Sequence, residues 1–311
     1  MSGPLSVLVR EVVRPRWAPF ALPPPGVDGV LRRRGDGRMR LLHRGDEPVV
    51  VAVAHPGPGR AVFAARAPSE AAARHGIERM RFATGVDDDL APFHARFAED
   101  PVIGSAVRAF PGLRTMRRPE PWEALAWAIT EQLIDLDRAA AIQRRMVSVL
   151  GRRCPRTGLR DAPTPAAVAA CAPARLAALD LAPKRAIAMR RVAAEVASGR
   201  VDLRGHDLRR LAAIREIGTW TVECVALFGQ GRLDTVPASD LGLLKLVGRL
   251  ATGNPRAVAD EAEARDFFAR YPGWAGLAGE YLRFAAVTGR LKTPRRAGTR
   301  WSTGATSTAA A

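Results

Sequence analysis

The spacing of apolar residues changes character near residue 121. Before it, short apolar runs at residues 39–42, 49–53 and 61–64 are divided by Gly-Asp and Pro-Gly turns. Runs of this length between such turns predict an antiparallel meander of four or five strands. Residues 68–98 then have apolar positions at helical spacing. The N-terminal part is therefore predicted to combine a sheet with helices.

From Pro121 onward the apolar residues follow a helical period, first from Trp122 to Leu136. Further helices are predicted over residues 137–150, 165–172, 174–179, 182–198, 207–214, 241–250, 257–271 and 274–288. The fold class is α+β: an α/β N-terminal domain (1–105) with an antiparallel sheet, followed by an all-helical region (106–292). Residues 293–311 are polar and rich in small residues, which predicts a disordered tail.

Residues 208–250 are the most informative stretch. A helical run ends at a tight Ile217-Gly218-Thr219 corner, and a second helix follows at once, which predicts a helix-turn-helix-like hairpin. The free backbone N–H groups at the start of that second helix suit a phosphate, either directly or through a bound cation. After a polar loop, Asp240 stands where a third helix begins. One carboxylate is thereby held at a fixed distance from a phosphate-binding turn.

The charge of the chain indicates an anionic partner. Its 48 Lys and Arg outnumber 31 Asp and Glu, which gives a formal net charge of +17 and a pI of about 11.3. Nucleic acid is the leading candidate for such a chain. A GC-rich genome favours arginine codons and explains why arginine replaces lysine. It does not explain the excess of basic over acidic residues.

The three cysteines, Cys154, Cys171 and Cys224, are widely separated and odd in number. They match neither a metal-binding spacing nor a disulfide framework, so a reducing cytoplasm is the expected compartment. No signal peptide is visible, and no apolar run reaches the length of a membrane span.

The hairpin also carries a resemblance to a known family. The string I-x-x-I-G-x-W-T from Ile214, followed about twenty residues later by V-P-x-x-D-L-G-L, is similar to the helix-hairpin-helix DNA glycosylases. More narrowly, it resembles the DNA-3-methyladenine glycosylase II (AlkA) branch. Similar blocks occur at residues 111–113, 122–125, 130–133, 163–165 and 179–186, in the same order. The resemblance covers roughly residues 100–290, and the first hundred residues match more weakly.

The resemblance implies a monofunctional DNA N-glycosylase of base excision repair. Such an enzyme flips an alkylated base of the 3-methyladenine or 7-methylguanine type out of double-stranded DNA and hydrolyses its N-glycosidic bond. The expected protein is a monomer in a bacterial-type cytoplasm, associated with the nucleoid, without membrane contact. Because no four-cysteine cluster lies near the C-terminus, the iron–sulfur members of the superfamily are disfavoured.

Asp240 is the predicted catalytic residue. Cleavage builds positive charge on the deoxyribose, and a carboxylate facing that sugar stabilises the charge. It can also orient or deprotonate the attacking water. The alternative is a helix N-cap at Leu241, a role that Ser239 could also fill. Both roles together are a third interpretation.

Trp220 occupies the hairpin position where lyase-type relatives carry a Schiff-base lysine, which implies a water-using enzyme without lyase activity. The resemblance makes it an aromatic that stacks on the extruded base; a core tryptophan is the alternative. The predicted base-pocket residues are Trp220, Gln132, Cys224, Tyr281 and Phe284.

Leu133 falls where the family has an apolar wedge that fills the gap left by a flipped nucleotide, although a leucine on an apolar helix is usually core. The predicted DNA-binding residues are Leu133, Arg215, Ile217, Gly218, Thr219, Lys245 and Arg249. No cofactor and no side-chain metal site are expected. A structural Na⁺ or K⁺ at the hairpin backbone of Arg215 and Ile217 is an expectation from the family.

Three positions depart from the family pattern. Glu216 stands in the hairpin where a glycine is usual, and its carboxylate is unfavourable beside a phosphate unless it points away. The tryptophan that stacks across the AlkA pocket falls near Arg283, and a pocket tyrosine is replaced by Cys224. Two alternatives therefore stay open: a non-catalytic helix-hairpin-helix protein that binds DNA or lesions, and a glycosylase for deaminated or oxidised bases.

Overall fold

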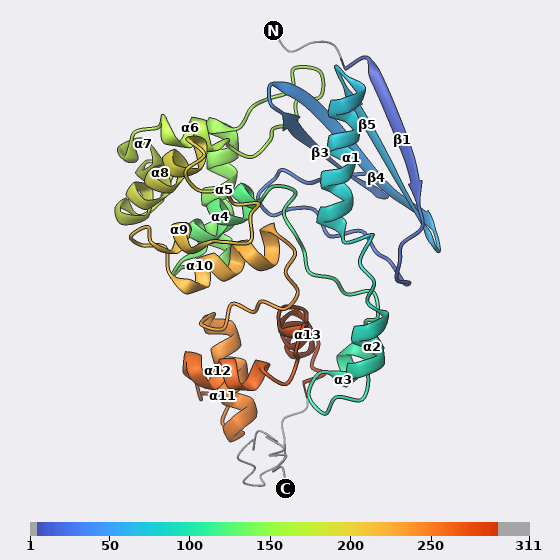
Figure 1. The fold of residues 1–311 in the computed structure, drawn as a ribbon, viewed down its shortest axis with the longest axis vertical. Helices are drawn as coiled ribbons and strands as arrows, with labels where there is room; N and C mark the ends of the chain where they lie inside the picture. Colours follow the sequence, from blue (N-terminus) through green and yellow to red (C-terminus); the bar gives the residue numbers. More distant parts are fainter. Residues whose placement is uncertain (1–4, 292–311) are drawn as a thin grey trace, which may run out of the picture.

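An antiparallel sheet forms the N-terminal part of this computed structural model, which describes residues 5–291 (Figure 1). The strand order is β1-β5-β4-β3-β2. The first strand lies outside the predicted meander and pairs along its full length with the last one. Gly35, Gly45 and Gly59 turn between successive strands with positive φ angles. The strands are β1 (Val7–Val13), β2 (Arg32–Arg34), β3 (Gly37–Arg44), β4 (Glu47–Gly57) and β5 (Arg60–Ala67).

Helix α1 (Glu70–Thr84) covers one face of the sheet (Figure 1). Ser69 caps it by accepting from the backbone N–H of Ala72, and Gly85 ends it in the left-handed conformation. A Cβ at Gly76 would lie 2.5 Å from a Val49 methyl carbon, so the glycine allows helix and sheet to approach closely. The resulting core joins valine, alanine and phenylalanine side chains of β4 and β5 to apolar side chains of α1.

Helix α4 lies at the centre of the helical body and is buried from Pro121 to Thr130. A Cβ at Gly229 would lie 2.9 Å from the Pro121 Cα, which shows how closely the segment after the hairpin packs on this helix. The elements of this body share one apolar core. They are α4 (Pro121–Glu131), α5 (Leu136–Leu150), α6 (Pro165–Ala169), α7 (Pro173–Ala177), α8 (Pro183–Ala197), α9 (Arg209–Ala212), α10 (Thr219–Cys224) and the π-helical turn η1 (Val225–Gly229).

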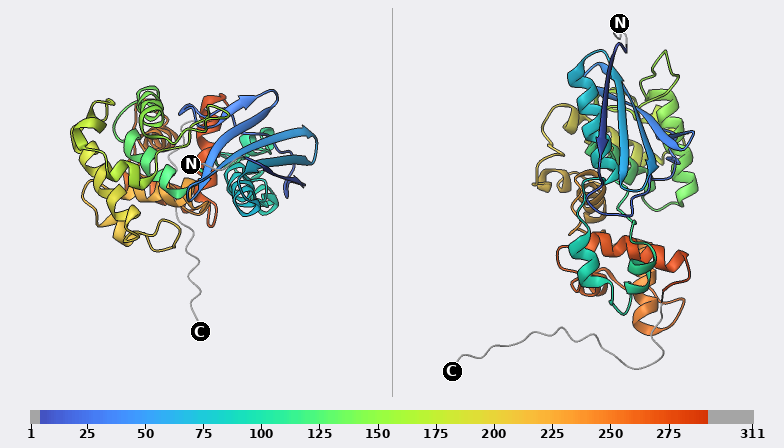
Figure 2. Two further views of the ribbon diagram at one scale, coloured as in Figure 1. Left: turned by 90° about the horizontal axis from the view of Figure 1, so that it is seen from above. Right: turned by 90° about the vertical axis from the view of Figure 1, so that its right-hand side faces the viewer.

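A further core is assembled from two distant parts of the chain. Helices α2 and α3 pack with the last three helices rather than with the sheet, and the teal and orange-red segments lie side by side in Figure 2. Phe93 stacks on Tyr281 with ring centroids 5.2 Å apart. The elements are α2 (Ala91–Phe97), α3 (Gly104–Ala109), α11 (Leu241–Thr252), α12 (Glu261–Phe268) and α13 (Ala275–Val287).

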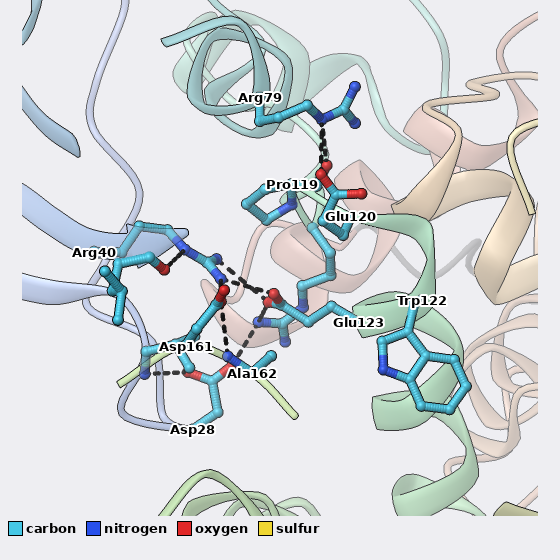
Figure 3. A network of polar contacts seen from close by, with 12 residues as sticks. Asp28, Arg40, Arg79, Pro119, Glu120, Trp122, Glu123, Asp161 and Ala162 are labelled. Carbon is cyan, nitrogen blue, oxygen red and sulfur yellow. Dashed lines mark hydrogen bonds and ion pairs between the residues drawn. The ribbon is translucent and has the colours of Figure 1, made fainter. Parts of the chain in front are cut away.

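Buried charges join the sheet to the helical body (Figure 3). Arg40 of β3 lies with Nη2 2.8 Å from Glu123 Oε2 of α4 and 3.5 Å from Asp161 Oδ1. Asp161 also contacts His43 Nδ1 at 2.9 Å. Only 3% and 2% of the Arg40 and Glu123 side chains are exposed. Burial works against the charge of Arg40, but Glu123 and Asp161 outweigh it and raise its pKa.

The predicted fold class is confirmed, and the end of α4 differs from its prediction. The apolar stripe runs on to Leu136, but the helix ends at Glu131 and Asp135 caps a new helix. The division into residues 1–105 and 106–292 stays a prediction. The predicted disordered tail, 293–311, lies outside the described residues. None of the helices between residues 5 and 291 has the length and apolar character needed to cross a bilayer.

Candidate active site

The hairpin turn presents unused backbone donors. Ile217 is buried, and its N–H donates to the carbonyl of Ile214 at 3.0 Å, which closes the turn. Gly218 is the N-cap of α10, and no side chain caps the helix. Among the hydrogen bonds of residues 5–291, none uses the N–H of Gly218, Thr219 or Trp220 as donor. Because Gly218 and Thr219 are exposed, these amides are free to meet an anion.

Glu216 is held in the left-handed region with φ 73°, the conformation that favours the glycine found at this place in the family pattern. Its backbone carbonyl accepts from Gln132 Nε2 at 3.3 Å, which ties the end of α4 to the hairpin. Its carboxylate lies 3.5 Å from Arg215 Nε, and both side chains are exposed. The acid is thus partly neutralised at the surface beside the turn.

Asp240 sits at the start of α11 and has several partners. Its Oδ1 accepts from the Leu243 N–H at 3.1 Å, so Asp240 itself is the N-cap and Ser239 is not. Trp220 Nε1 donates to Oδ2 at 3.4 Å. Arg283 Nη1 lies 3.1 Å from Oδ1, and 20% of the Asp240 side chain is exposed. The capping role is therefore present, and one oxygen still faces the hairpin tryptophan.

Helix α10 carries two of the predicted base-pocket residues. Trp220 is half-buried, and Cys224 follows one turn later. Burial raises the pKa of the Cys224 thiol, and the nearby carboxyls of Glu131 and Asp240 add to the shift. Gln132 Nε2 also donates to Thr221 Oγ1 at 3.0 Å. Of the predicted pocket residues, Trp220, Gln132 and Cys224 are therefore brought to the hairpin.

Tyr281 and Phe284 are not brought to Asp240. Tyr281 is fully buried, and its hydroxyl donates to the Phe110 carbonyl at 2.9 Å. Burial raises its pKa. Phe284 packs edge-on against Phe110 with ring centroids 4.7 Å apart. Both belong to the packing between α3 and α13, so their positions give no support to the predicted base contacts.

Leu133 is the most exposed large apolar residue of the described part of the chain. Its side chain is 96% exposed and its φ is +56°, so it projects from the turn between α4 and α5 and contributes nothing to the core. Lys245 and Arg249 lie on the exposed side of α11, and Arg215 is exposed beside the turn. These positions allow the predicted DNA contacts without testing them.

Sequence reasoning assigned no role to three charged groups near Asp240, namely Glu131, Glu280 and Arg283. Arg283 stands where the family pattern places a pocket tryptophan, which is the one hint that pointed to it. Glu131 ends α4 and Glu280 lies on α13. Burial raises the pKa of both carboxyls, Arg118 and Arg283 respectively oppose the shift, and the charge of Asp240 adds to it. The site therefore holds more than the one acid that the motif supplies.

For metal ions, residues 5–291 contain no group of three or more His, Cys, Asp or Glu side chains arranged to hold one. At the hairpin, no hydrogen bond of the described residues ends on the carbonyl oxygens of Arg215 or Ile217. Both oxygens are thus available to a monovalent cation, and the Na⁺ or K⁺ site stays a prediction.

Comparison with known proteins finds DNA glycosylases among the proteins of similar sequence and among those of similar structure. No protein-family model matches the chain. A DNA-3-methyladenine glycosylase of Bacillus subtilis is 28% identical over 185 residues. That match takes in 57% of this chain, which spans 61% of the length of the relative.

Solved structures share the fold. A 3-methyladenine DNA glycosylase of Archaeoglobus fulgidus matches 90% of this chain and 98% of its own, with a TM-score of 0.74 and 17% identity. The 8-oxoguanine glycosylase/lyase of Clostridium acetobutylicum in complex with double-stranded DNA matches 85% and 90%, with a TM-score of 0.66 and 15% identity. A 3-methyladenine DNA glycosylase of Schizosaccharomyces pombe in complex with abasic DNA matches 65% and 100%, with a TM-score of 0.53 and 20% identity.

Proposed function

We propose that this chain, which has the fold of the helix-hairpin-helix DNA glycosylase superfamily, is a monofunctional DNA N-glycosylase that excises alkylated bases from duplex DNA. The substrates would be of the 3-methyladenine and 7-methylguanine type, and the reaction opens base excision repair. The observation that carries the proposal is Asp240, partly exposed, with Oδ2 3.4 Å from the indole nitrogen of Trp220 on the hairpin.

The chemistry follows from that placement. As the base departs, positive charge grows on the deoxyribose, and the carboxylate of Asp240 stabilises it electrostatically. The cap bond from Leu243 and the bond from Trp220 fix the carboxylate in advance, so little reorganisation is needed during the reaction. The same oxygens can receive a proton from the attacking water. Trp220 offers the aromatic face against which a flipped base stacks.

Binding to the duplex would use the turn and the exposed leucine. The free N–H groups of Gly218 and Thr219 would meet a backbone phosphate, with Lys245 and Arg249 adding contacts from α11. Leu133 would enter the stack and occupy the place of the extruded nucleotide. The net charge of +17 supports an anionic partner of this kind.

The absence of lyase activity is inferred from the residue at position 220, and the substrate class from the names of the relatives. A tryptophan at position 220 supplies no amine for a Schiff base, which supports a mechanism without lyase activity. The B. subtilis relative and two of the structural relatives are named as 3-methyladenine glycosylases, which supports the alkylated-base class and the AlkA branch. We infer a monomeric protein in the cytoplasm, near the nucleoid.

One observation favours the non-catalytic alternative. The positive guanidinium of Arg283 offsets the negative charge with which Asp240 would stabilise the sugar cation. A protein that only binds lesions tolerates such a pair. The glycosylase for deaminated or oxidised bases is the other alternative, and it differs in the base that leaves.

Replacement of Asp240 by Asn tests the function. Asparagine caps helices as well as aspartate, so the fold is retained while the charge is lost. We expect single-turnover release of alkylated bases from methylated duplex DNA to fall at least about 100-fold. Asp260→Asn is the matched control, because Asp260 is an aspartate N-cap on α12 with no part in the site. Equal release by the wild type and Asp240→Asn would leave only the binding function.

A further inference from the structure

The outermost strand of the sheet on the β3 side consists of three arginines. This strand, β2, runs from Arg32 to Arg34, and all three residues are exposed. Arg144 of α5 joins them, because its Cγ would lie 3.9 Å from a Cβ placed at Gly29, three residues before the strand. Arg32, Arg33, Arg34 and Arg144 together form a surface that we call the arginine patch.

Backbone oxygens, rather than carboxylates, hold most of these side chains. Arg32 Nε donates to the Gly29 carbonyl at 3.2 Å, and Arg33 Nε donates to the Gly35 carbonyl at 3.1 Å. Arg144 Nη1 donates to the Val27 carbonyl at 2.7 Å. Within residues 5–291 none of the four patch arginines forms an ion pair. Their guanidinium groups are therefore oriented by the protein without being neutralised by it.

Two readings of this charge differ in what they explain. Charged side chains on an outermost strand keep it from pairing with other sheets, and this accounts for arginines on β2. It does not account for Arg144, which comes from a helix and leaves its charge unpaired beside the strand. Unneutralised guanidinium groups from two elements fit closely spaced anions, and the phosphates of nucleic acid supply such a row.

The arginine patch lies away from the hairpin. Helix α5 starts at Leu136, close to the exposed Leu133, and Arg144 lies about 12 Å further along the helix axis. Just beyond the end of α5, Arg152 Nη1 donates to the carbonyl of Gly45, between β3 and β4, at 2.7 Å. The helix thus leads from the hairpin side of the molecule to the sheet. A duplex held at the hairpin leaves the arginine patch to a different stretch of DNA.

We propose that the arginine patch is a second surface for the sugar–phosphate backbone of DNA, which receives another DNA segment while the hairpin still holds the first. The inference rests on the duplex binding of the proposed function and not on its chemistry. Contacts to phosphates carry no sequence information, so the second segment can be any undamaged duplex. Holding two segments at once lets the protein pass from one to the other without first being released into solvent.

The test follows the dissociation of a short labelled duplex from the full-length chain as unlabelled, undamaged duplex is added at increasing concentration. We expect the dissociation rate of the wild type to rise with competitor concentration, because the competitor binds the arginine patch before the first duplex leaves. Arg32 and Arg34 lie on the same face of β2. In Arg32→Gln/Arg34→Gln the slope of that rise should fall at least about 10-fold, since two phosphate contacts are lost. Arg144→Gln should lower the slope less, and base release from a short methylated duplex should stay unchanged in both variants.

Arg10→Gln/Arg66→Gln is the matched control. Both residues are exposed on β1 and β5, at the other side of the sheet, and within residues 5–291 neither forms an ion pair. The net charge falls by the same amount, and the slope should stay that of the wild type. An equal loss in the control would mean that net charge alone speeds the exchange, which overturns the inference.

Two further outcomes separate the inference from the function beneath it. A wild-type dissociation rate that does not depend on competitor concentration overturns the second surface and leaves the glycosylase standing. Competitor-dependent exchange that is lost in Arg32→Gln/Arg34→Gln, without any base release by the wild type, would support the second surface and end the catalytic part of the proposed function.

Discussion

Two regions of the molecule use charge in opposite ways. The seam, formed by Arg40, Glu123 and Asp161, joins the sheet to the helical body. The edge, formed by the hairpin with Leu133, Asp240 and Arg283, holds the candidate site. At the seam, Arg40 and Glu123 are almost fully buried, and each satisfies the other. At the edge, Asp240 and Arg283 are partly exposed, and no hydrogen bond of the described residues uses Nη2 of Arg283. Buried and fully paired charges fix the position of a domain. Partly exposed charges with spare hydrogen-bonding capacity are the ones available to a substrate.

The edge also carries backbone strain that the seam lacks. Leu133 and Glu216 both have positive φ angles, and both lie beside the site. Such conformations cost free energy and persist where the surrounding structure enforces them. We therefore expect substitutions at the seam to lower stability, and substitutions at the edge to change activity or even to raise stability.

The largest effect is expected at the seam. Glu123→Gln removes the charge that compensates buried Arg40, and we expect a loss of about 3 kcal/mol in the free energy of unfolding, measured with urea. Glu120→Gln is the control, because Glu120 is a third exposed and pairs with the exposed Arg204 as well as with Arg79. Its loss should stay below about 1 kcal/mol. Equal losses would show that burial does not distinguish the two acids.

Leu133→Ala should have the next largest effect, on activity alone. The side chain is exposed, so the free energy of unfolding should change by less than about 0.5 kcal/mol. Without the wedge we expect single-turnover base release to fall about 10-fold, equivalent to about 1.4 kcal/mol. Leu136→Ala, at the exposed start of α5, is the control and should fall less. A clear loss of stability in Leu133→Ala would place the leucine in the core after all.

Glu216→Gly should raise both the stability of the protein and its affinity for duplex DNA, unlike a substitution at the seam. Glycine adopts the left-handed conformation freely, and the relief exceeds its entropic cost by about 0.5–1 kcal/mol. The melting temperature should rise, and duplex affinity should rise because a carboxylate leaves the phosphate site. Glu216→Gln removes the charge alone and separates the two contributions. Unchanged affinity in both variants would show that this carboxylate points away from bound DNA.

The smallest effect concerns Asp207, just before α9. The side chain and then the backbone N–H of Arg209 lower the pKa of this exposed carboxyl from 3.8 to about 2. Its contribution to stability is therefore present above pH 3.8 and is lost as the pH falls through about 2. An NMR titration should give this midpoint, and Arg209→Gln should move it upward. A midpoint near 3.8 in the wild type would contradict the interaction.

Much of the fold followed from local patterns. The turns between β-strands, the helical period after Pro121 and the hairpin around Gly218 are all set by residues close together in sequence, and the structure has them. The end of α4 did not follow, because Leu133 and Leu136 continue its apolar stripe. The positive φ of Leu133 and the cap bond from the Arg138 N–H to Asp135 show that α4 has ended and that a new helix begins at Leu136.

Only the site residues that lie within the motif of residues 214–243 could be predicted from the sequence. Asp240 and Trp220 lie in one continuous stretch, so their spacing carried information. Arg283 is 43 residues beyond Asp240, and its contact depends on how α13 packs on α11. Tyr281 stands two positions earlier on the same helix. Since residues two apart on a helix point in different directions, the tyrosine enters the core while the arginine reaches the site.

The core that joins α2 and α3 to the last three helices has a consequence for synthesis on the ribosome. Residues 90–110 are synthesised more than 100 residues before the helices that cover their apolar sides, which lie between residues 241 and 287. Until α13 has left the exit tunnel, Phe93 and its neighbours have no packing partner on that side. A chain released before that point would expose these apolar side chains to other nascent chains. Premature termination should therefore lead to aggregation more readily here than in a protein whose cores form in sequence order.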